Sequence, residues 1–351
     1  MTTEFKKPVK MLNEIRAVPD VVARQLEQNA GVIQELVAAM QSRNPLFAVT
    51  VARGTSDHAA AFMKYAFENH LGLITSSSNP STTTLYGNAL HWEKALVVGI
   101  SQSGRSPDLV ATLRAARAGG ALTVALVNHA DSPLALESEF VLPMRAGIEE
   151  AVAATKTFVA SLSAILHWLE VCKPDADLQK ALHGLPRQLE TTLGLEPEIA
   201  AGILRYQNAE AVIALARGLH HPMAMETALK LKETSVLHAE SFSTAEFAHG
   251  PIILAERGLP VIAFQGRDAT AASSAGLYRE VAKRGADLTV IGDVSIDVGA
   301  NWRLETPPTG HALTDPIAGI VAAYLLAGHL SLARGFDPDA PRQLNKVTMT
   351  L

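Results

Sequence analysis

The sequence is poor in cysteine and has no hydrophobic run of membrane-spanning length. Its 351 residues include one cysteine, Cys172 in ILHWLEVCKP, which excludes a disulfide framework and a thiolate metal site. We interpret it as a buried thiol of a cytoplasmic protein. The longest apolar run, Ile317 to Gly328, is shorter than the roughly 20 residues of a membrane span, so we expect a buried helix there. The N-terminal MTTEFKKPVK lacks the apolar core of a signal peptide.

An excess of either charge is also lacking. There are 30 Lys and Arg against 35 Asp and Glu, a formal net charge of −5, and both signs are mixed along the chain. No basic cluster points to a nucleic-acid partner. A hydrophobic share of 48% with 19% charged residues is typical of a globular protein. A chain of this length is expected to form two domains.

Short runs rich in Val, Ile and Leu alternate with longer helical stretches. Buried strands are expected at 45–54, 94–104, 121–129, 209–218, 259–266 and 286–293, with helices at 58–70 and 107–120. Continuous apolar strands that alternate with helices indicate parallel sheets covered on both faces. The sequence therefore predicts an α/β fold.

The same pattern starts twice along the chain. VTVARGTSDHAAAF and IALARGLHHPMAME each contain a strand that ends in Ala-Arg-Gly and leads into a helix, which suggests two lobes of similar design. We expect a helical extension at 1–44 broken at Pro19, a first domain at 45–200, a second at 201–340 and a tail at 341–351. The segment 151–201 is expected to be mostly helical.

A serine-rich turn, SQSGRS, joins the strand at 94–104 to the helix that begins at Pro107. Ligands of open α/β sheets bind at this end of the strands, where a helix N-terminus offers N–H groups and partial positive charge. Gly104 permits close approach of the backbone. Together with RGTSDH, which follows the first strand, the turn suits a phosphate monoester. The alternative is an ordinary N-cap at Ser106; a nucleotide P-loop and G-x-G-x-x-G are both absent.

Charged residues in the helical stretch METALKLKETS recur on one face. Glu226, Lys230 and Glu233 are spaced i, i+4, i+7. This spacing is also typical of a solvated stripe of salt bridges, and both interpretations stay open at this point. His249 alone carries no signal, and Lys346, so close to the end of the chain, would ordinarily be a mobile surface charge.

Five segments, in this order, resemble the sugar-isomerase (SIS) domains of glucosamine-6-phosphate synthase. They are RGTSDHAA, ISQSGRSPD, EEAVAATKTF, METALKLKETSVLHAESFSTAEFAHGP and PRQLNKVT. The resemblance runs from about Met11 onward. It implies two SIS domains, each a parallel sheet flanked by helices in a flavodoxin-like three-layer sandwich, and a homodimer with its site near the subunit interface.

The resemblance also implies roles for individual residues. Glu233 would be the base that moves a proton between C1 and C2, and His249 would open and close the sugar ring. Lys346 would sit at the anomeric carbon, Lys230 would be an auxiliary cation, and the backbone of Val152 would contact sugar hydroxyls. The sugar phosphate would be held by Thr55, Ser56, Ser101, Gln102, Ser103 and Ser106.

The sequence departs from the synthase pattern at several positions. Arg53 replaces a cysteine, Arg105 a glutamate, Ala154 a serine and Ala248 a lysine. The glutamine-hydrolysing domain of the synthase has no counterpart here, so we do not expect ammonia from glutamine. SQSGRSP and the chain length are similar to those of stand-alone SIS-type glucosamine-6-phosphate deaminases.

We therefore expect an enzyme that converts glucosamine 6-phosphate and water into fructose 6-phosphate and ammonia. No cofactor is expected, because the substrate's own carbonyl and imine acidify the C2 proton, and the adjacent histidines of LHHP lack the i, i+4 spacing of a helical zinc site. A ketose/aldose phosphate isomerase or a fructosamine-6-phosphate deglycase is the alternative enzyme. A non-catalytic sugar-phosphate sensor is the alternative of another class, and the gluco or galacto epimer stays open.

Overall fold

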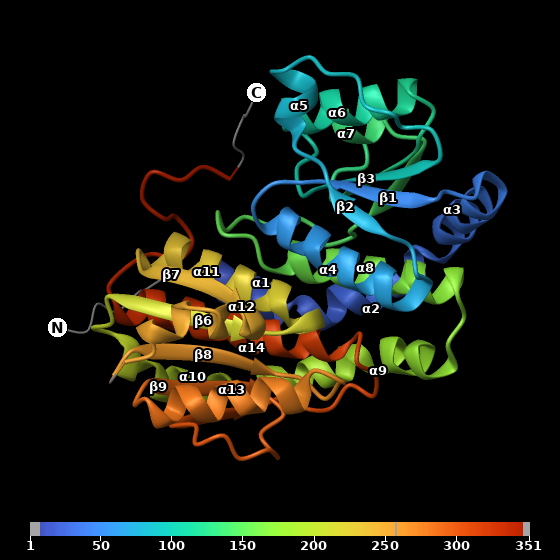
Figure 1. Ribbon diagram of the computed structural model, residues 1–351. Coiled ribbons are helices and arrows are strands. Elements are labelled where there is room, and N and C mark those ends of the chain that lie inside the picture. Colours follow the sequence, from blue (N-terminus) through green and yellow to red (C-terminus); the bar gives the residue numbers. More distant parts are fainter. Residues whose placement is uncertain (1–7, 257, 347–351) are drawn as a thin grey trace. The chain divides into compact units, whose positions relative to one another are not determined.

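The computed structural model describes residues 8–256 and 258–346, which form parts of two compact units (Figure 1). The first-sheet unit comprises Asp20–Glu149, Lys156–His183 and Asn345–Leu351. The second-sheet unit comprises Met1–Pro19, Glu150–Thr155 and Gly184–Leu344. Residues 1–7 of the predicted extension and 347–351 of the predicted tail lie outside the described residues.

The first-sheet unit contains five parallel strands in the order β2-β1-β3-β4-β5. They are β1 Phe47–Val51, β2 Thr75–Ser77, β3 Ala95–Ser101, β4 Leu122–Val127 and β5 Phe140–Pro143. Every residue of β3 and β4 is buried, because both faces of the sheet carry helices. Alternate residues serve each face: Val49, Val97 and Ala125 pack with Leu109 and Leu113.

Helices cover both faces of this first sheet (Figure 1). Helices α4 Thr55–Leu71 and α8 Lys156–Cys172 lie together on one face, where Phe67 meets Trp168 edge-on with ring centroids 5.1 Å apart. Helices α5 Pro80–Thr84, α6 Pro107–Ala118 and α7 Pro133–Leu136 cover the other. The unit also contains α3 Ala30–Arg43 and most of α2 Val18–Gln28.

Cys172 is half-buried, and burial raises its thiol pKa to about 12.

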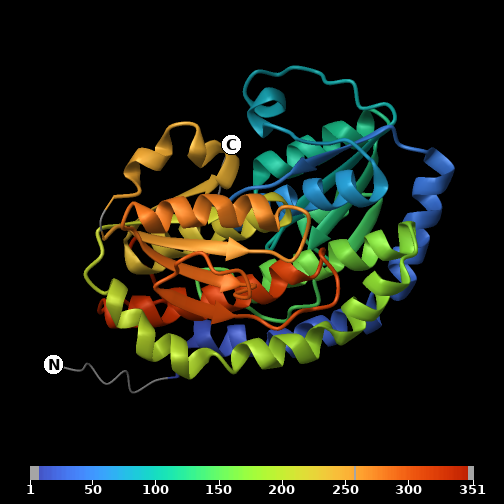
Figure 2. The same cartoon turned by 60° about the horizontal axis from the view of Figure 1, so that its bottom comes forward.

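The second-sheet unit repeats this design with the strand order β10-β9-β8-β6-β7, again all parallel. The strands are β6 Ala211–Ala216, β7 His238–Ser243, β8 Pro260–Gln265, β9 Asp287–Gly292 and β10 Trp302–Glu305. Helices α11 His221–Ser235 and α14 Asp315–Ala333 cover one face, and α12 Thr244–Ala248 and α13 Ala271–Lys283 the other (Figure 2). Ile213, Val261 and Leu288 pack against Tyr278 of α13.

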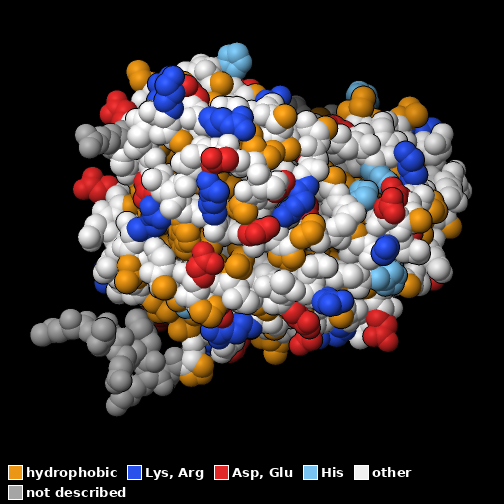
Figure 3. Space-filling model, turned by 90° about the horizontal axis from the view of Figure 1, so that it is seen from below, with side chains coloured by type: hydrophobic (Ala, Val, Ile, Leu, Met, Phe, Trp, Pro, Cys, Tyr) orange, Lys and Arg blue, Asp and Glu red, His pale blue; other side chains and the backbone are white. Residues whose placement is uncertain are grey.

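Three further helices complete the described fold. They are α1 Lys10–Arg16, α9 Ala176–Leu193, which contributes residues to both units, and α10 Glu196–Gly202. Helix α14 is long and apolar enough to cross a membrane by length and composition, but 83% of its apolar window is buried inside the protein. That burial confirms the helix predicted over 317–328. On the face seen in Figure 3, charged side chains of both signs are interspersed with apolar ones.

The structure confirms the predicted fold: two parallel sheets, each flanked by helices. Six predicted strands lie where the apolar runs placed them, whereas the four edge strands, β2, β5, β7 and β10, were missed. An edge strand pairs on one side and faces solvent, so it needs no apolar run: two of the three residues of β2 are exposed.

The helical extension breaks at Ala17 and Asn29, not at Pro19. Pro19 sits in the first turn of α2, where its missing N–H costs nothing.

The two Ala-Arg-Gly turns share a backbone conformation but lead into different structures. Gly54 and Gly218 have φ values of +56° and +58°, which glycine adopts without steric cost. Helix α4 begins directly after Gly54, whereas a short 3₁₀ turn, Gly218–His220, precedes α11. His220 is buried, and a Cβ added to Gly266 would lie 2.6 Å from its ring. The carboxyl edge of the second sheet is thus filled by an imidazole where the first has hydroxyls.

The surroundings of His220 predict a loss of stability in acid. Burial lowers its pKa below the ordinary 6.5, against the opposing effect of Asp268 and Asp315, while Arg267 lowers it further. As pH falls, His220 therefore binds a proton more readily in the unfolded chain than in the folded chain. Above pH 6.5 this difference does not lower the free energy of unfolding, and below pH 6.5 it lowers that free energy increasingly as pH falls. Urea unfolding between pH 7 and 5 is expected to show a shallower pH dependence in His220→Gln.

The matched control for that measurement is His238→Gln. His238 belongs to the same unit and its side chain is 74% exposed. The control is expected to keep the acid sensitivity of the parent chain. Equal pH dependence in His220→Gln and the parent would show that another group controls acid stability.

Candidate functional site

Hydroxyl-bearing turns follow two neighbouring strands of the first sheet. Strands β1 and β3 are parallel, with Val51 opposite Gly99, so the turns at their carboxyl ends meet at one edge. Thr55 and Ser56 are the first residues of α4. Four more predicted phosphate contacts occupy the end of β3 and the turn into α6: Ser101, Gln102, Ser103 and Ser106. Both helices direct their N-termini to this edge, which is the arrangement that a phosphate monoester requires.

Hydrogen bonds within the turn fix its shape. The Ser101 hydroxyl accepts a hydrogen bond from the Gly104 amide at 3.1 Å, and the Ser103 hydroxyl one from the Arg105 amide at 3.4 Å. Gly104 has a φ of +61°, and a Cβ there would lie 2.1 Å from the Ser132 hydroxyl oxygen. The position therefore requires glycine.

Ser106 occupies the N-cap position of α6, but its side chain makes no capping hydrogen bond there. The half-buried hydroxyl is thus not committed to the helix. The alternative left open by the sequence was that Ser106 is an ordinary N-cap. Its backbone does occupy the N-cap position, but its side chain does not cap the helix.

An ion pair that was not predicted from the sequence connects the two turns. Arg53 donates through Nε and Nη2 to one carboxylate oxygen of Asp108, at 3.1 and 2.9 Å. The Asp108 side chain is fully buried in the first turn of α6, and its other oxygen accepts from the Leu109 amide at 2.9 Å. The signal available in the sequence was an arginine directly before Gly-Thr-Ser. The pair holds a guanidinium beside the phosphate turns.

A second carboxyl group lies in the first turn of α4. Burial raises the pKa of Asp57, while the positive charges of His58 and Arg53 act in the opposite direction. Arg105 is exposed on the neighbouring turn.

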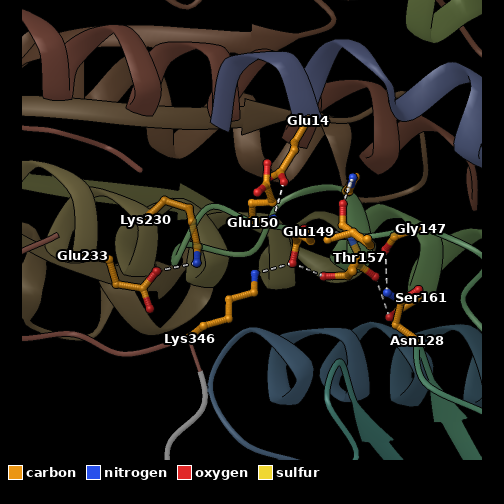
Figure 4. Close-up of polar contacts among 12 residues, drawn as sticks. Glu14, Asn128, Gly147, Glu149, Glu150, Thr157, Ser161, Lys230, Glu233 and Lys346 are labelled. Atoms are coloured by element: carbon orange, nitrogen blue, oxygen red, sulfur yellow. Dashed lines mark hydrogen bonds and ion pairs between the residues drawn. The ribbon is translucent and has the colours of Figure 1, made fainter. Parts of the chain in front are cut away.

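In the second-sheet unit, α11 carries the charged face that the spacing predicted. The Lys230 ammonium lies 3.5 Å from Glu226 Oε1. It also makes a short contact with Glu233, which Figure 4 shows. The side chains of Lys230 and Glu226 are 1% and 0% exposed, and that of Glu233 is 26% exposed. The solvated stripe is therefore wrong for this face. Tyr324 of α14 donates to Glu226 at 3.1 Å, which leaves Glu233 as the carboxylate that reaches solvent.

His249 and Val152 belong to the same unit. His249 follows α12 and is exposed, and its amide donates to the carbonyl of Glu246 at 3.0 Å. The Val152 amide donates to the carbonyl of Asp339 at 3.1 Å, so this N–H is already bonded. A contact between Val152 and sugar hydroxyls would have to use its carbonyl.

Lys346 and Glu149 form an ion pair in the first-sheet unit. Their charged atoms are 2.7 Å apart, the Glu149 side chain is fully buried and that of Lys346 is 24% exposed (Figure 4). Lys346 is therefore not the mobile surface charge that a tail position suggests. Glu149 was not predicted from the sequence, because EEAVAATKTF contains two adjacent glutamates and no pattern distinguishes the buried one.

No group of three or more His, Cys, Asp or Glu side chains in residues 8–256 and 258–346 could hold a metal ion. The candidate residues described above include groups for acid–base and electrostatic chemistry. The first-sheet unit supplies hydroxyls, helix N-termini and the cations Arg53, Arg105 and Lys346. The second-sheet unit supplies a carboxylate that shares a buried lysine, and an exposed imidazole.

Comparisons with known proteins identify related sequences and structures. The SIS domain model matches residues 47–169 and again 205–327. Glutamine--fructose-6-phosphate aminotransferase [isomerizing] of Legionella pneumophila is 35% identical over 347 residues, which is 96% of this chain and 57% of that protein. The chain thus spans a little over half the length of this relative.

Two solved structures share the fold along nearly the whole chain. A candidate phosphosugar isomerase from Silicibacter pomeroyi DSS-3 has a TM-score of 0.88 at 39% identity, covering 95% of this chain and 100% of that one. The C-terminal domain of glucosamine-fructose-6-phosphate aminotransferase from Francisella tularensis has a TM-score of 0.84 at 27% identity, covering 97% and 100%.

The buried ion pairs on α11 predict a large effect of a lysine substitution on stability. Lys230→Met leaves Glu226 buried without its cation, which is expected to lower the free energy of unfolding by about 3–5 kcal/mol. Urea unfolding measures the loss. Lys232→Met, at an exposed position of the same helix, is the matched control and should change stability by less than about 0.5 kcal/mol.

A second variant tests whether the uncompensated charge is the cause. Adding Glu226→Gln to Lys230→Met removes the buried carboxylate and is expected to recover part of the loss. A Lys230→Met protein as stable as Lys232→Met would contradict this account.

Proposed function

Because the chain belongs to the SIS domain family, we propose that it is an enzyme that deaminates glucosamine 6-phosphate to fructose 6-phosphate and ammonia. The observation that carries the proposal is the arrangement on α11, where buried Lys230 contacts both Glu226 and the partly exposed Glu233. A carboxylate beside a fixed ammonium suits proton transfer next to a carbonyl. The match over 96% of the chain to the Legionella glutamine--fructose-6-phosphate aminotransferase supports a sugar 6-phosphate as the ligand and a reaction that adds or removes an amino group.

The proposed steps use side chains of this chain alone. The turns at Thr55–Ser56 and Ser101–Ser106 hold the phosphate by hydroxyl groups and helix N-termini. His249 protonates the ring oxygen and opens the pyranose. Glu233 removes the C2 proton and returns it to C1 through an enolamine, and water attacks the resulting C2 imine as ammonia leaves. In this scheme Lys346 brings its ammonium to the C1–C2 region.

A second enzyme activity has its own support. The 39% identical structure from Silicibacter pomeroyi is that of a candidate phosphosugar isomerase. A ketose/aldose isomerase would use the same base and the same phosphate contacts but would release no ammonia. A phosphorylated amino sugar and a second copy of the chain are the proposed partners, and a cytoplasmic location stays a prediction.

A substrate panel distinguishes these activities. Glucosamine 6-phosphate, galactosamine 6-phosphate, fructose 6-phosphate, a fructosamine 6-phosphate and unphosphorylated glucosamine are incubated with the protein, and ammonia and ketose are measured. The proposal expects ammonia and a ketose 6-phosphate in equal amounts from an amino-sugar phosphate, the ketose being fructose 6-phosphate when the substrate is glucosamine 6-phosphate, with very little turnover of glucosamine. Aldose–ketose conversion without ammonia favours the isomerase. Equal turnover of glucosamine and its 6-phosphate would contradict a phosphate site.

The assignment of Glu233 predicts a loss of proton exchange. Glu233→Gln keeps the shape of the side chain but removes its basicity, so turnover is expected to fall by ~10²–10⁴-fold. NMR of C1 and C2 proton exchange in deuterated water measures the step directly. Glu240→Gln, at an exposed glutamate of the same unit, is the control. Exchange at the wild-type rate in Glu233→Gln means that the base is another group.

A further inference from the structure

The end of the described chain is fixed by a buried carboxylate. The ammonium of Lys346 lies 2.7 Å from Glu149 Oε2. These residues are 197 positions apart in the sequence. Terminal segments are usually poorly ordered unless specific contacts hold them, and this contact places the Lys346 amine at a defined point.

The Glu149 carboxylate is itself held on its other side (Figure 4). The Thr157 amide donates to Oε1 at 3.1 Å and the Thr157 hydroxyl to Oε2 at 2.9 Å. Thr157 is the second residue of α8, so the helix N-terminus stabilises the negative charge. The Ser161 hydroxyl donates to the Thr157 carbonyl at 2.8 Å. The orientation of the carboxylate is thus set by a helix of seventeen residues.

We propose that Glu149 is a positioning residue, which holds the Lys346 amine in its working place before substrate binds. The inference rests on the proposed function, in which Lys346 acts at the anomeric carbon. Lysine has a flexible four-carbon stem with several rotamers, and a loss of position of about 1 Å can slow a reaction by ~10²-fold. Thr157 acts through Glu149: its hydrogen bonds hold the Glu149 carboxylate, and the carboxylate holds the Lys346 amine.

The first experiment measures the contact without substrate or turnover. Wild-type protein and Glu149→Gln are treated briefly with an acetylating reagent, and the modification of each lysine is quantified by mass spectrometry. Glutamine keeps the shape and an acceptor for Thr157 but has no charge for Lys346. Acetylation of Lys346 is expected to rise several-fold in the variant.

The neighbouring glutamate provides a matched control. The Glu150 side chain is 58% exposed and pairs with Lys10 at 3.2 Å. Glu150→Gln is therefore expected to leave the acetylation of Lys346 and the activity unchanged. A melting temperature is measured for every variant, so that a change at Lys346 is not mistaken for general unfolding.

The second experiment measures the consequence for the reaction. In Glu149→Gln, kcat for the phosphosugar substrate is expected to fall by ~10–100-fold, while KM stays within about twofold because separate hydroxyl turns hold the phosphate. In a Lys346→Arg background, the same Glu149 substitution is expected to have a much smaller effect. This non-additivity separates a role exercised through Lys346 from a merely structural one.

Thr157→Val is the second variant, for use if Glu149→Gln does not fold. It removes one donor to Glu149 but keeps the charge, and it is expected to give smaller changes of the same sign. Unchanged Lys346 acetylation in a folded Glu149→Gln protein overturns the inference, as does unchanged kcat with increased acetylation. A wild-type protein inactive on every sugar phosphate would contradict the proposed function, whereas the acetylation result still decides whether Glu149 holds Lys346.

Discussion

Parallel pairing of neighbouring strands is the constraint on which the candidate site depends. Because β1 and β3 run in the same direction, with Val51 opposite Gly99, their two following turns lie at one edge and both following helices begin there. In an antiparallel pair these turns would lie at opposite edges. Thr55 begins α4 after β1 and Ser101 ends β3, and the pairing of these two strands brings the two hydroxyls to the same edge.

The second sheet shows that parallel pairing determines where the turns lie but not which side chains they carry. Its Ala-Arg-Gly turn has the same positive φ as the first, at Gly218, but buried His220 follows where the first repeat has hydroxyls. Arg267 pairs with Asp315 at 3.2 Å on the same edge, so side chains of the unit fill it. The proposed base of this unit, Glu233, lies instead on α11, where Lys230 contacts it and Glu226.

Local patterns predicted most of the fold, and the family resemblance supplied the candidate site residues, but neither indicated which of those residues are buried. The apolar strands and the spacing of Glu226 and Lys230 follow from near neighbours in the sequence. Whether that charged face is solvated depends on Tyr324, which is 98 residues from Glu226. The pair of Glu149 and Lys346 spans 197 residues. No periodicity reports contacts at such separations, so the sequence could not distinguish a buried ion pair from a solvated one.

Two ion pairs of the first-sheet unit share one design. Asp108 in the first turn of α6 holds Arg53, and Glu149, in the loop before α8, accepts hydrogen bonds from the start of that helix and holds Lys346; both carboxylates are fully buried. In each ion pair, a backbone amide at the start of the helix donates to the carboxylate, and the carboxylate holds a basic side chain from a distant segment of the chain. A side chain ordered in the free protein loses little further entropy when substrate binds. The N-termini of α6 and α8 therefore hold the two carboxylates in place, and the carboxylates in turn hold the side chains of Arg53 and Lys346 in defined positions.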